Sequence, residues 1–195
     1  MDAASERVRI RAGGRSEKVR QAVGEAALAF LAEGQLAFTV VDVAARAGVG
    51  RRTVYRWWPT REDLLKEALE AHVRRVPTVE DSGSWERDLR ALAHRLAQFA
   101  ADPVEIALAQ LMAGGQHLKF NQMVLAQWQP TMESWRRLVQ KAIERGDVAA
   151  ERGPGTVIDT LLAPIFYSPL SLQRSMTRAE VDALVDLLLS GTRAR

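Results

Sequence analysis

The sequence predicts an all-α protein of about nine helices, and three observations support that fold class. Apolar residues recur at intervals of three and four along most of the chain, which places them on one face of an α-helix. No segment shows the apolar–polar alternation that is typical of a half-buried strand. The 195 residues are 47% hydrophobic and 26% charged, as expected for a folded globular chain.

Three helices are expected in the amino-terminal part of the chain. Apolar residues at helical spacing predict the first over residues 16–33, and Gly34 can end it in the left-handed conformation. Thr39 begins a second helix over residues 40–47, with Asp42 three residues later in the arrangement of a capping box. The third helix is expected from near Gly50 to the residue before Pro59, because the residue before a proline avoids the helical conformation.

Six more helices are expected in the rest of the chain. Thr60 is placed to cap the fourth helix, and Asp102 precedes Pro103 in a favourable helix start. Thr177 and Glu180 match a capping box before the last helix. A turn-rich connector is expected over residues 77–83. The expected helices cover residues 61–76, 84–101, 103–114, 118–146 with a bend near Pro130, 155–170 and 177–191.

The composition argues against several classes of function. Cysteine is absent, so there is no disulfide framework or thiolate metal site, and His72, His94 and His117 show no metal-binding spacing. The chain carries no phosphate-binding loop, nucleophile elbow or dinucleotide motif. We therefore expect no cofactor, no metal and no enzymatic activity. No segment is long and apolar enough to suggest a signal core or a membrane span, so a cytoplasmic location is expected.

Positive charge is concentrated near the amino terminus. Residues 1–61 hold eleven Lys and Arg against six Asp and Glu, a net charge of +5, whereas residues 62–195 hold sixteen against eighteen, a net charge of −2. A basic head on a mildly acidic body suggests a polyanion as partner, although a solvated charged surface would look the same.

Residues 38–65 combine this charge with a helix-turn-helix pattern. Two short helices flank the turn Gly48-Val49-Gly50, where glycine supplies the bent backbone. Val54 and Trp58 are four residues apart and should face inward. The opposite face carries groups that can bind base edges or phosphates: Arg51, Arg52, Thr53, Tyr55 and Arg56.

Residues 15–69 resemble the DNA-binding domain of the TetR-type (tetracycline-repressor-like) bacterial transcription regulators. The resemblance is carried, in order, by Gly34, Thr39-Val40, Asp42-Val43-Ala44, Ala47-Gly48-Val49, Thr53-Val54-Tyr55, Trp58, Arg61-Glu62 and Leu64-Leu65. The chain departs from that pattern with Gly50 in place of the usual Ser, Arg52 where Gly or Ala is frequent, and Trp57 in place of His or Tyr.

The resemblance implies an amino-terminal arm and DNA-binding domain over residues 1–60, and a ligand-binding and dimerisation domain over residues 61–195. A homodimer would bind a palindromic double-stranded operator and would be released by a small, largely apolar effector. The residues expected to contact DNA are Thr39, Gly50, Arg51, Arg52, Thr53, Tyr55, Arg56, Trp57 and Arg61.

Two further sets of residues are expected in the carboxy-terminal domain. Apolar side chains with one polar anchor that could line a ligand pocket are Phe99, Met112, His117, Phe120, Trp128 and Trp135. Apolar stripes on the last two helices predict a dimer interface through Leu161, Ile165, Leu184 and Leu188, although part of each stripe must belong to the core of the protomer itself.

Other interpretations of the sequence stay open. Arg7, Arg9, Arg11 and Arg15 could form an arm that reaches a DNA groove, or a solvated tail. The chain could be a DNA-binding protein without an effector, in which case its body would be packed solid. It could also be a helical small-molecule-binding protein or enzyme whose basic head is incidental.

Overall fold

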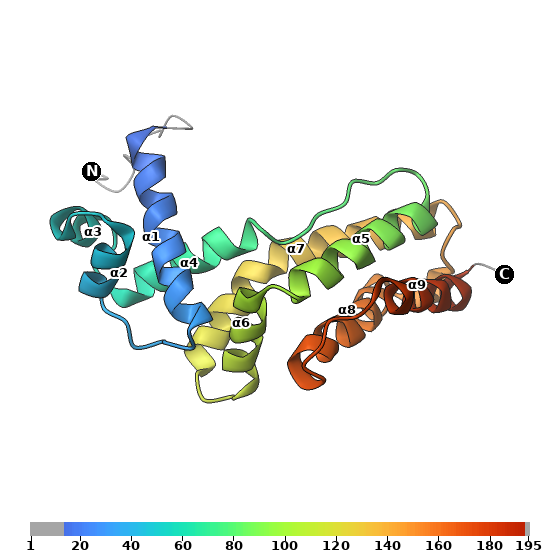
Figure 1. The fold of residues 1–195 in the computed structure, drawn as a ribbon. Helices are drawn as coiled ribbons and strands as arrows, with labels where there is room; N and C mark the ends of the chain where they lie inside the picture. The colour runs from blue at the N-terminus through green and yellow to red at the C-terminus, as the bar shows by residue number, and fades with distance from the viewer. Residues whose placement is uncertain (1–13, 194–195) are drawn as a thin grey trace. The chain divides into compact units, whose positions relative to one another are not determined.

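The computed structural model describes residues 14–193, and this part of the chain is built from helices (Figure 1). Within it no strand is present, apart from an isolated bridge between Val148 and Arg193, and no helix is long and apolar enough to cross a membrane. The predicted all-α fold class is confirmed. The helices are α1 Arg15–Ala32, α2 Val40–Ala47, α3 Arg51–Trp57, α4 Arg61–Val73, α5 Trp85–Ala100, α6 Pro103–Ala113, α7 Leu118–Glu144, the short 3-10 helix η1 Ala150–Arg152, α8 Pro154–Ser171 and α9 Arg178–Thr192.

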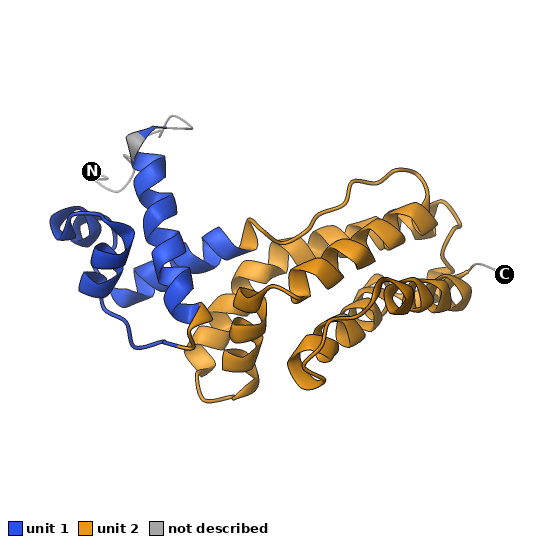
Figure 2. Cartoon of the chain, in the orientation of Figure 1, with its two compact units in different colours: residues 1–31, 35–72 blue, residues 32–34, 73–195 orange. Residues whose placement is uncertain are grey.

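The chain forms two compact units (Figure 2). Unit 1 holds residues 1–31 and 35–72, and unit 2 holds residues 32–34 and 73–195. The boundary predicted from the sequence, after residue 60, falls one helix earlier. The observed boundary between the units differs from the predicted one because α4 packs with α1 in unit 1. The division of functions at residue 60 stays a prediction.

The helices α1 to α4 of unit 1 enclose a small apolar core. Gly24 on α1 allows a close approach to α4, because a Cβ at this position would lie only 3.2 Å from the Cβ of Ala71. Val23, Val54 and Leu64 bring α1, α3 and α4 into the same core, each with 0% exposure. Burying one such side chain contributes roughly 1.5–3 kcal/mol to stability.

Unit 2 has a larger apolar core, to which α5, α7, α8 and α9 contribute. The contacts join α5 to α8 and α9, α7 to α8, and α8 to α9, and Figure 1 shows α8 and α9 side by side. Each of these four helices contributes a side chain that is at most 1% exposed, namely Leu89, Trp135, Ile158 and Val185. Their helical spacing explains why the sequence predicted the helices themselves correctly.

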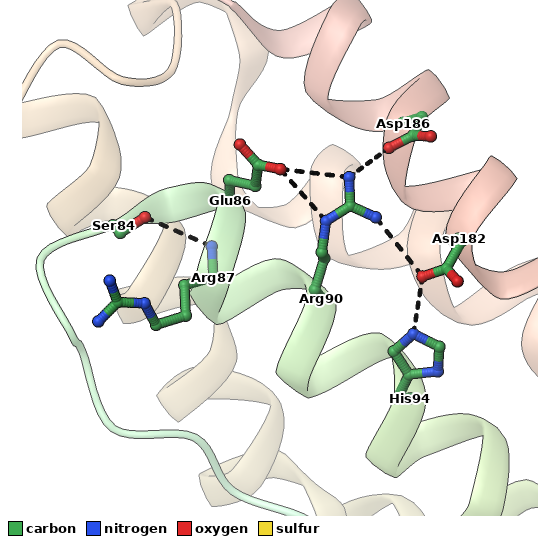
Figure 3. Close-up of polar contacts among 7 residues, drawn as sticks. All are labelled: Ser84, Glu86, Arg87, Arg90, His94, Asp182 and Asp186. Atoms are coloured by element: carbon green, nitrogen blue, oxygen red, sulfur yellow. Dashed lines mark hydrogen bonds and ion pairs between the residues drawn. The ribbon is translucent and has the colours of Figure 1, made fainter. Parts of the chain in front are cut away.

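Polar contacts tie α5 to α9 on the surface of this unit (Figure 3). Arg90 and His94 on α5 point toward Asp182 and Asp186 on α9. The His94 Nε2 and an oxygen of Asp182 are 2.8 Å apart, and Arg90 contacts both aspartates and Glu86. The hydrogen bond to His94, together with nearby positive charge, lowers the pKa of Asp182.

The connector between α4 and α5 is held to the helices of unit 2 by hydrogen bonds along its length. The Nε1 of Trp135 donates to the carbonyl of Pro77 at 3.1 Å, and the Nη1 of Arg95 donates to the carbonyl of Thr78 at 2.7 Å. The carboxylate of Asp81 lies 2.9 Å from Arg145. The backbone N–H of Gly83 lowers the pKa of Asp81, with help from the charges of Arg145 and Lys141.

Most helix ends agree with the sequence analysis, but the fourth helix ends earlier than predicted and one short helix was not predicted. The capping boxes at Thr39 and Thr177 are present, and Asp102 caps α6 as expected. The fourth helix ends at Val73 rather than at residue 76, because the chain turns before Pro77 with a hydrogen bond from Val76 N to Val73 O. The 3-10 helix at residues 150–152 was not predicted, since three residues carry no periodic signal.

Candidate nucleic-acid interface

The turn between α2 and α3 has the geometry that its glycine predicts. Gly48 adopts the left-handed conformation, with φ 63° and ψ 27°, and the N–H of Val49 donates to the carbonyl of Ala44 at 3.1 Å. Ala44 on α2 and Val54 on α3 are 2% and 0% exposed. The two helices therefore meet as a helix-turn-helix with a buried apolar interface.

Thr39 caps α2 and uses its hydrogen-bond donors to do so. Its backbone N–H and its hydroxyl both donate to Asp42 Oδ2, at 2.8 and 2.6 Å, and the hydroxyl accepts from the Asp42 N–H at 3.2 Å. The hydroxyl of Thr39 lowers the pKa of Asp42. The predicted contact between Thr39 and DNA therefore requires this cap to rearrange, and in the free protein Thr39 serves to start the helix.

Four of the predicted DNA-contacting side chains form one exposed face of α3. Arg51, Arg52, Tyr55 and Arg56 are all exposed, and at about 100° per residue they fall within an arc of about 140°. Val54, on the opposite side, is fully buried. Three guanidinium groups and one phenol hydroxyl thus share a surface that can enter a major groove and reach bases and phosphates.

The other predicted contacts lie around this face. Thr53 and Trp57 are half-buried, and the Trp57 ring lies 5.5 Å from that of Trp58, measured between centroids. Gly50 precedes α3 without a side-chain cap, and a Cβ there would meet nothing within 4 Å. Arg61 is exposed at the start of α4, and its Nη1 donates to the carbonyl of Leu36 at 3.2 Å.

A buried polar network beneath α3 was not predicted from the sequence. Trp58, correctly expected in the core, is 5% exposed, and its Nε1 donates to Glu67 of α4 at 3.1 Å. Arg20 of α1 donates to the same carboxylate. This hydrogen bond to Glu67 raises the pKa of Arg20. The partners are 9 and 47 residues apart in sequence, so only the crossing of the helices brings them together.

The structure brings together three of the six residues predicted to line a ligand pocket. The ring of Trp128 lies 5.9 Å from Phe99 and 6.1 Å from Trp135, and it also lies 6.1 Å from Phe166 of α8. We call these four residues the aromatic cluster. It joins α5, α7 and α8 beside the core of unit 2.

The remaining three predicted pocket residues are placed differently. Phe120 is 5% exposed in the first turn of α7, and Met112 is half-buried near the end of α6. His117 is exposed and lies at the residue before α7. An exposed side chain at a helix start is poorly placed to line an enclosed apolar pocket, so His117 is not part of the aromatic cluster.

The burial of three of the four predicted dimer residues requires a correction, whereas Leu184 stays a prediction. Leu161, Ile165 and Leu188 are 0%, 1% and 7% exposed and belong to the core of unit 2, and Leu184 is partly buried against that core. Side chains covered by their own protomer are not available to a partner. The large apolar side chains that α8 and α9 do expose are Tyr167, at 56%, and Leu187, at 69%.

The structure leaves two other expectations as they were. Arg7, Arg9 and Arg11 lie outside the described residues, as does the side chain of Arg15, so the role of the arm stays a prediction. Within residues 14–193, no group of three or more His, Asp or Glu side chains could hold a metal ion.

Comparison with known proteins agrees with this geometry. Residues 25–68 match the description "Bacterial regulatory proteins, tetR family", and residues 79–188 match "Tetracyclin repressor-like, C-terminal domain". The uncharacterized HTH-type transcriptional regulator YdeS of Bacillus subtilis is 28% identical over 187 residues, covering 92% of each chain. The HTH-type transcriptional repressor LfrR of Mycolicibacterium smegmatis is 38% identical over 99 residues, covering 51% of this chain and 44% of LfrR.

A solved structure shows the same fold. The transcriptional regulator FadR from Bacillus subtilis, in complex with stearoyl-CoA, matches with a TM-score of 0.69 and 17% identity, over 88% of this chain and 98% of that one. A helix-turn-helix with a basic exposed face, on an all-α chain with these relatives, defines a DNA-binding transcriptional regulator. The chain belongs to the tetracycline-repressor-like (tetR) family of bacterial regulatory proteins.

Proposed function

We propose that the protein is a ligand-responsive repressor that binds a palindromic operator as a homodimer and is released by a small, largely apolar molecule. The observation that carries the proposal is the exposed face of α3, where three arginines and Tyr55 lie opposite buried Val54. An arginine fork can bind guanine O6 and N7, while a hydroxyl can bind a phosphate. Of its relatives, LfrR is named a repressor.

Exposed faces of α8 and α9 support the two-fold part of the proposal. Thr160, Ala163 and Tyr167 are exposed at helical spacing on α8, and Ala183, Leu187 and Ser190 are exposed at helical spacing on α9. Most of these side chains are small, which allows helices to approach closely. We place the interface on these exposed residues, and not on Leu161, Ile165 and Leu188.

The aromatic cluster supports a response to an apolar effector. Phe99, Trp128, Trp135 and Phe166 offer flat apolar surfaces beside the core, which is the usual lining of a small-molecule site. The structural relative FadR binds stearoyl-CoA, a ligand with a long apolar chain. An effector that shifts α4 would change the separation of the two α3 helices, and a coupling free energy of about 1–3 kcal/mol or more is needed for an effect.

The proposal also includes a regulatory role without catalysis and a cytoplasmic location. Family membership supports a regulatory role in place of an enzymatic one. A regulator must reach the chromosome, so we place the protein in the cytoplasm. No observation favours the alternative of a carrier or enzyme with an incidental basic head over this assignment.

Selection of random-sequence DNA by the purified protein tests the proposal. We expect enriched duplexes to contain two inverted half-sites, because helix-turn-helix dimers place their recognition helices about 34–36 Å apart, or multiples of that spacing. Sedimentation of the complex should show two protomers, or a multiple of two, on each duplex. Enrichment of a single, unrepeated half-site would contradict the homodimer, and the absence of any enriched sequence would contradict operator binding.

A second measurement tests the effector. Stearoyl-CoA and a panel of smaller apolar compounds would be titrated against the complex with the selected duplex, with Trp fluorescence and release of labelled DNA as the readouts. We expect at least one compound to change both signals, and Trp128→Ala to weaken that response while preserving DNA binding. Release that is unaffected by loss of Trp128 would place the effector away from the aromatic cluster.

A further inference from the structure

One oxygen of Glu67 accepts hydrogen bonds from two other elements of unit 1. Its Oε2 accepts from the Nε1 of Trp58 at 3.1 Å and from the Nε and Nη2 of Arg20 at 3.2 and 3.1 Å. Trp58 follows directly after α3, Arg20 lies within α1, and Glu67 lies within α4. Three of the four helices in this unit are therefore joined at a single carboxylate.

The environment of this carboxylate is poorly suited to a role in stability alone. Glu67 is 5% exposed, and its second oxygen, Oε1, is buried and accepts no hydrogen bond from any described residue. Burying a charge with half of its acceptor capacity unused is unfavourable, and apolar replacements of buried ion pairs are often neutral or stabilising. A group retained at such a cost is better explained by the arrangement that it specifies.

Apart from its packing against α2, the recognition helix α3 has few other contacts that could specify its arrangement. It is seven residues long, Val54 is its only buried residue, and Gly50 provides no side-chain cap at its start. Apolar burial of Val54 is non-directional, so it resists separation from the core more than rotation about the helix axis. The bond from Trp58 to Glu67 adds a directional constraint at the carboxyl end of α3.

We propose that Glu67 is a positioning residue for DNA recognition, which fixes the carboxyl end of α3 against α1 and α4 so that Arg51 and Arg52 meet bases in one register. Attraction to phosphates depends on charge and tolerates small rotations of the helix, whereas a bidentate bond to a base edge does not. Loss of the Glu67 network should therefore reduce discrimination between DNA sequences, and should spare binding to arbitrary duplexes.

The triple variant Arg20→Met, Glu67→Leu and Trp58→Phe tests this inference. It replaces the network with apolar side chains, leaves no unpaired N–H from Trp58 or Arg20, and preserves the net charge. We expect an unfolding midpoint equal to or above that of the wild type, affinity for an arbitrary duplex within about twofold, and affinity for the selected operator at least about tenfold lower. The matched control is Lys18→Gln with Glu25→Gln, a charge-neutral change of two exposed residues on α1.

Two single variants keep the inference testable if the triple variant does not fold. Trp58→Phe removes the indole N–H. Glu67→Gln keeps an oxygen that can accept a hydrogen bond, so the Gln variant should discriminate between operator and arbitrary DNA better than a Leu variant at position 67. Amide hydrogen exchange over residues 51–57 should accelerate in Trp58→Phe by about threefold or more relative to the rest of unit 1. This readout does not need an operator, so it separates the inference from the proposed palindromic binding.

The opposite results would overturn the proposal. A folded triple variant whose ratio of operator to arbitrary-duplex affinity stays within about twofold of the wild type would make the network structural only. Unchanged hydrogen exchange over α3 in Trp58→Phe would also contradict a positioning role, as would equal losses of affinity for both kinds of DNA.

Discussion

Arg51, Arg52, Tyr55 and Arg56 share one face of α3, yet their chemistry suits different targets on DNA. A guanidinium fork can form two parallel hydrogen bonds with guanine, which carries sequence information. A phenol hydroxyl at Tyr55, 48% exposed, has one donor and is suited to a phosphate, which carries none. The same surface therefore offers groups suited to selectivity and groups suited to register.

This difference predicts distinct effects of single substitutions. Arg52→Ala should cost about 1–3 kcal/mol of operator affinity and relax the preference at one base pair, if this guanidinium binds a base edge. Tyr55→Phe should weaken binding to every duplex by a similar factor. Titrations of operator and scrambled duplex against each variant measure both effects, with Arg87→Ala, an exposed arginine of unit 2, as the charge-matched control. Equal losses for both duplexes in Arg52→Ala would assign that residue to the phosphates.

At the scale of single elements, α9 begins with a charged cap that should respond to pH. Glu180 bonds to Arg174 and closes the capping box with Thr177, and these hydrogen bonds lower its pKa from 4.5 to about 2. A carboxyl whose pKa is lowered in the folded state stabilises that state above its unfolded pKa. The stabilisation is lost as pH falls from about 4.5 to about 2.

The variant Glu180→Gln should accordingly be less stable than the wild type at pH 7. The difference in the free energy of unfolding should shrink as the pH falls from 4.5 toward 2, because the wild-type carboxylate then becomes protonated. Urea unfolding at a series of pH values measures this difference. Glu151→Gln, exposed on η1, is the control. A difference that stays constant down to pH 2 would show that the charge of Glu180 contributes nothing.

The elements were largely predictable from the sequence, because their signals are local. The period of apolar residues and the caps at Thr39 and Thr177 act within a few residues, and they identified nine helices that all occur among residues 14–193. The exposed face of α3 was predictable for the same reason, since Val54 and Trp58 define its buried side.

The partner that buries each apolar face of α8 and α9 was less predictable, because it depends on contacts between helices far apart in sequence. The spacing of Leu161, Ile165 and Leu188 shows that one face of each helix is buried, but not whether a neighbouring helix or a second protomer buries it. The same limit applies to Glu67, since an acidic residue at helical spacing is ordinarily solvated. Only the crossing with α1 makes Glu67 a partner of Arg20.

At the scale of the whole molecule, the proposed dimer should determine operator affinity. Leu187 is 69% exposed on α9, and a charge at a two-fold interface lies close to its own copy in a desolvated environment. Leu187→Glu should therefore give a helical monomer with weak operator binding, because the two half-sites are no longer bound within one complex. Sedimentation, circular dichroism and operator titration measure the three properties.

The control for this substitution is Leu125→Glu, which adds the same charge at a 57% exposed position of α7. It should leave both the dimer and operator binding intact. If Leu187→Glu remains a dimer with wild-type affinity, the two-fold contact lies on another surface of the protein.

The connector between α4 and α5 bears on where the chain can be cut or extended. Its composition suggests a loose loop, yet the carbonyls of Pro77 and Thr78 are engaged by Trp135 and Arg95. A protease must bind the backbone in an extended form, and an inserted domain needs flanking residues that can move apart. Whether a segment tolerates cleavage or insertion therefore depends on the hydrogen bonds of its backbone more than on its position in the sequence. Residues 114–117, between α6 and α7, are all exposed, so that loop is the better place for a fluorescent label or an inserted domain.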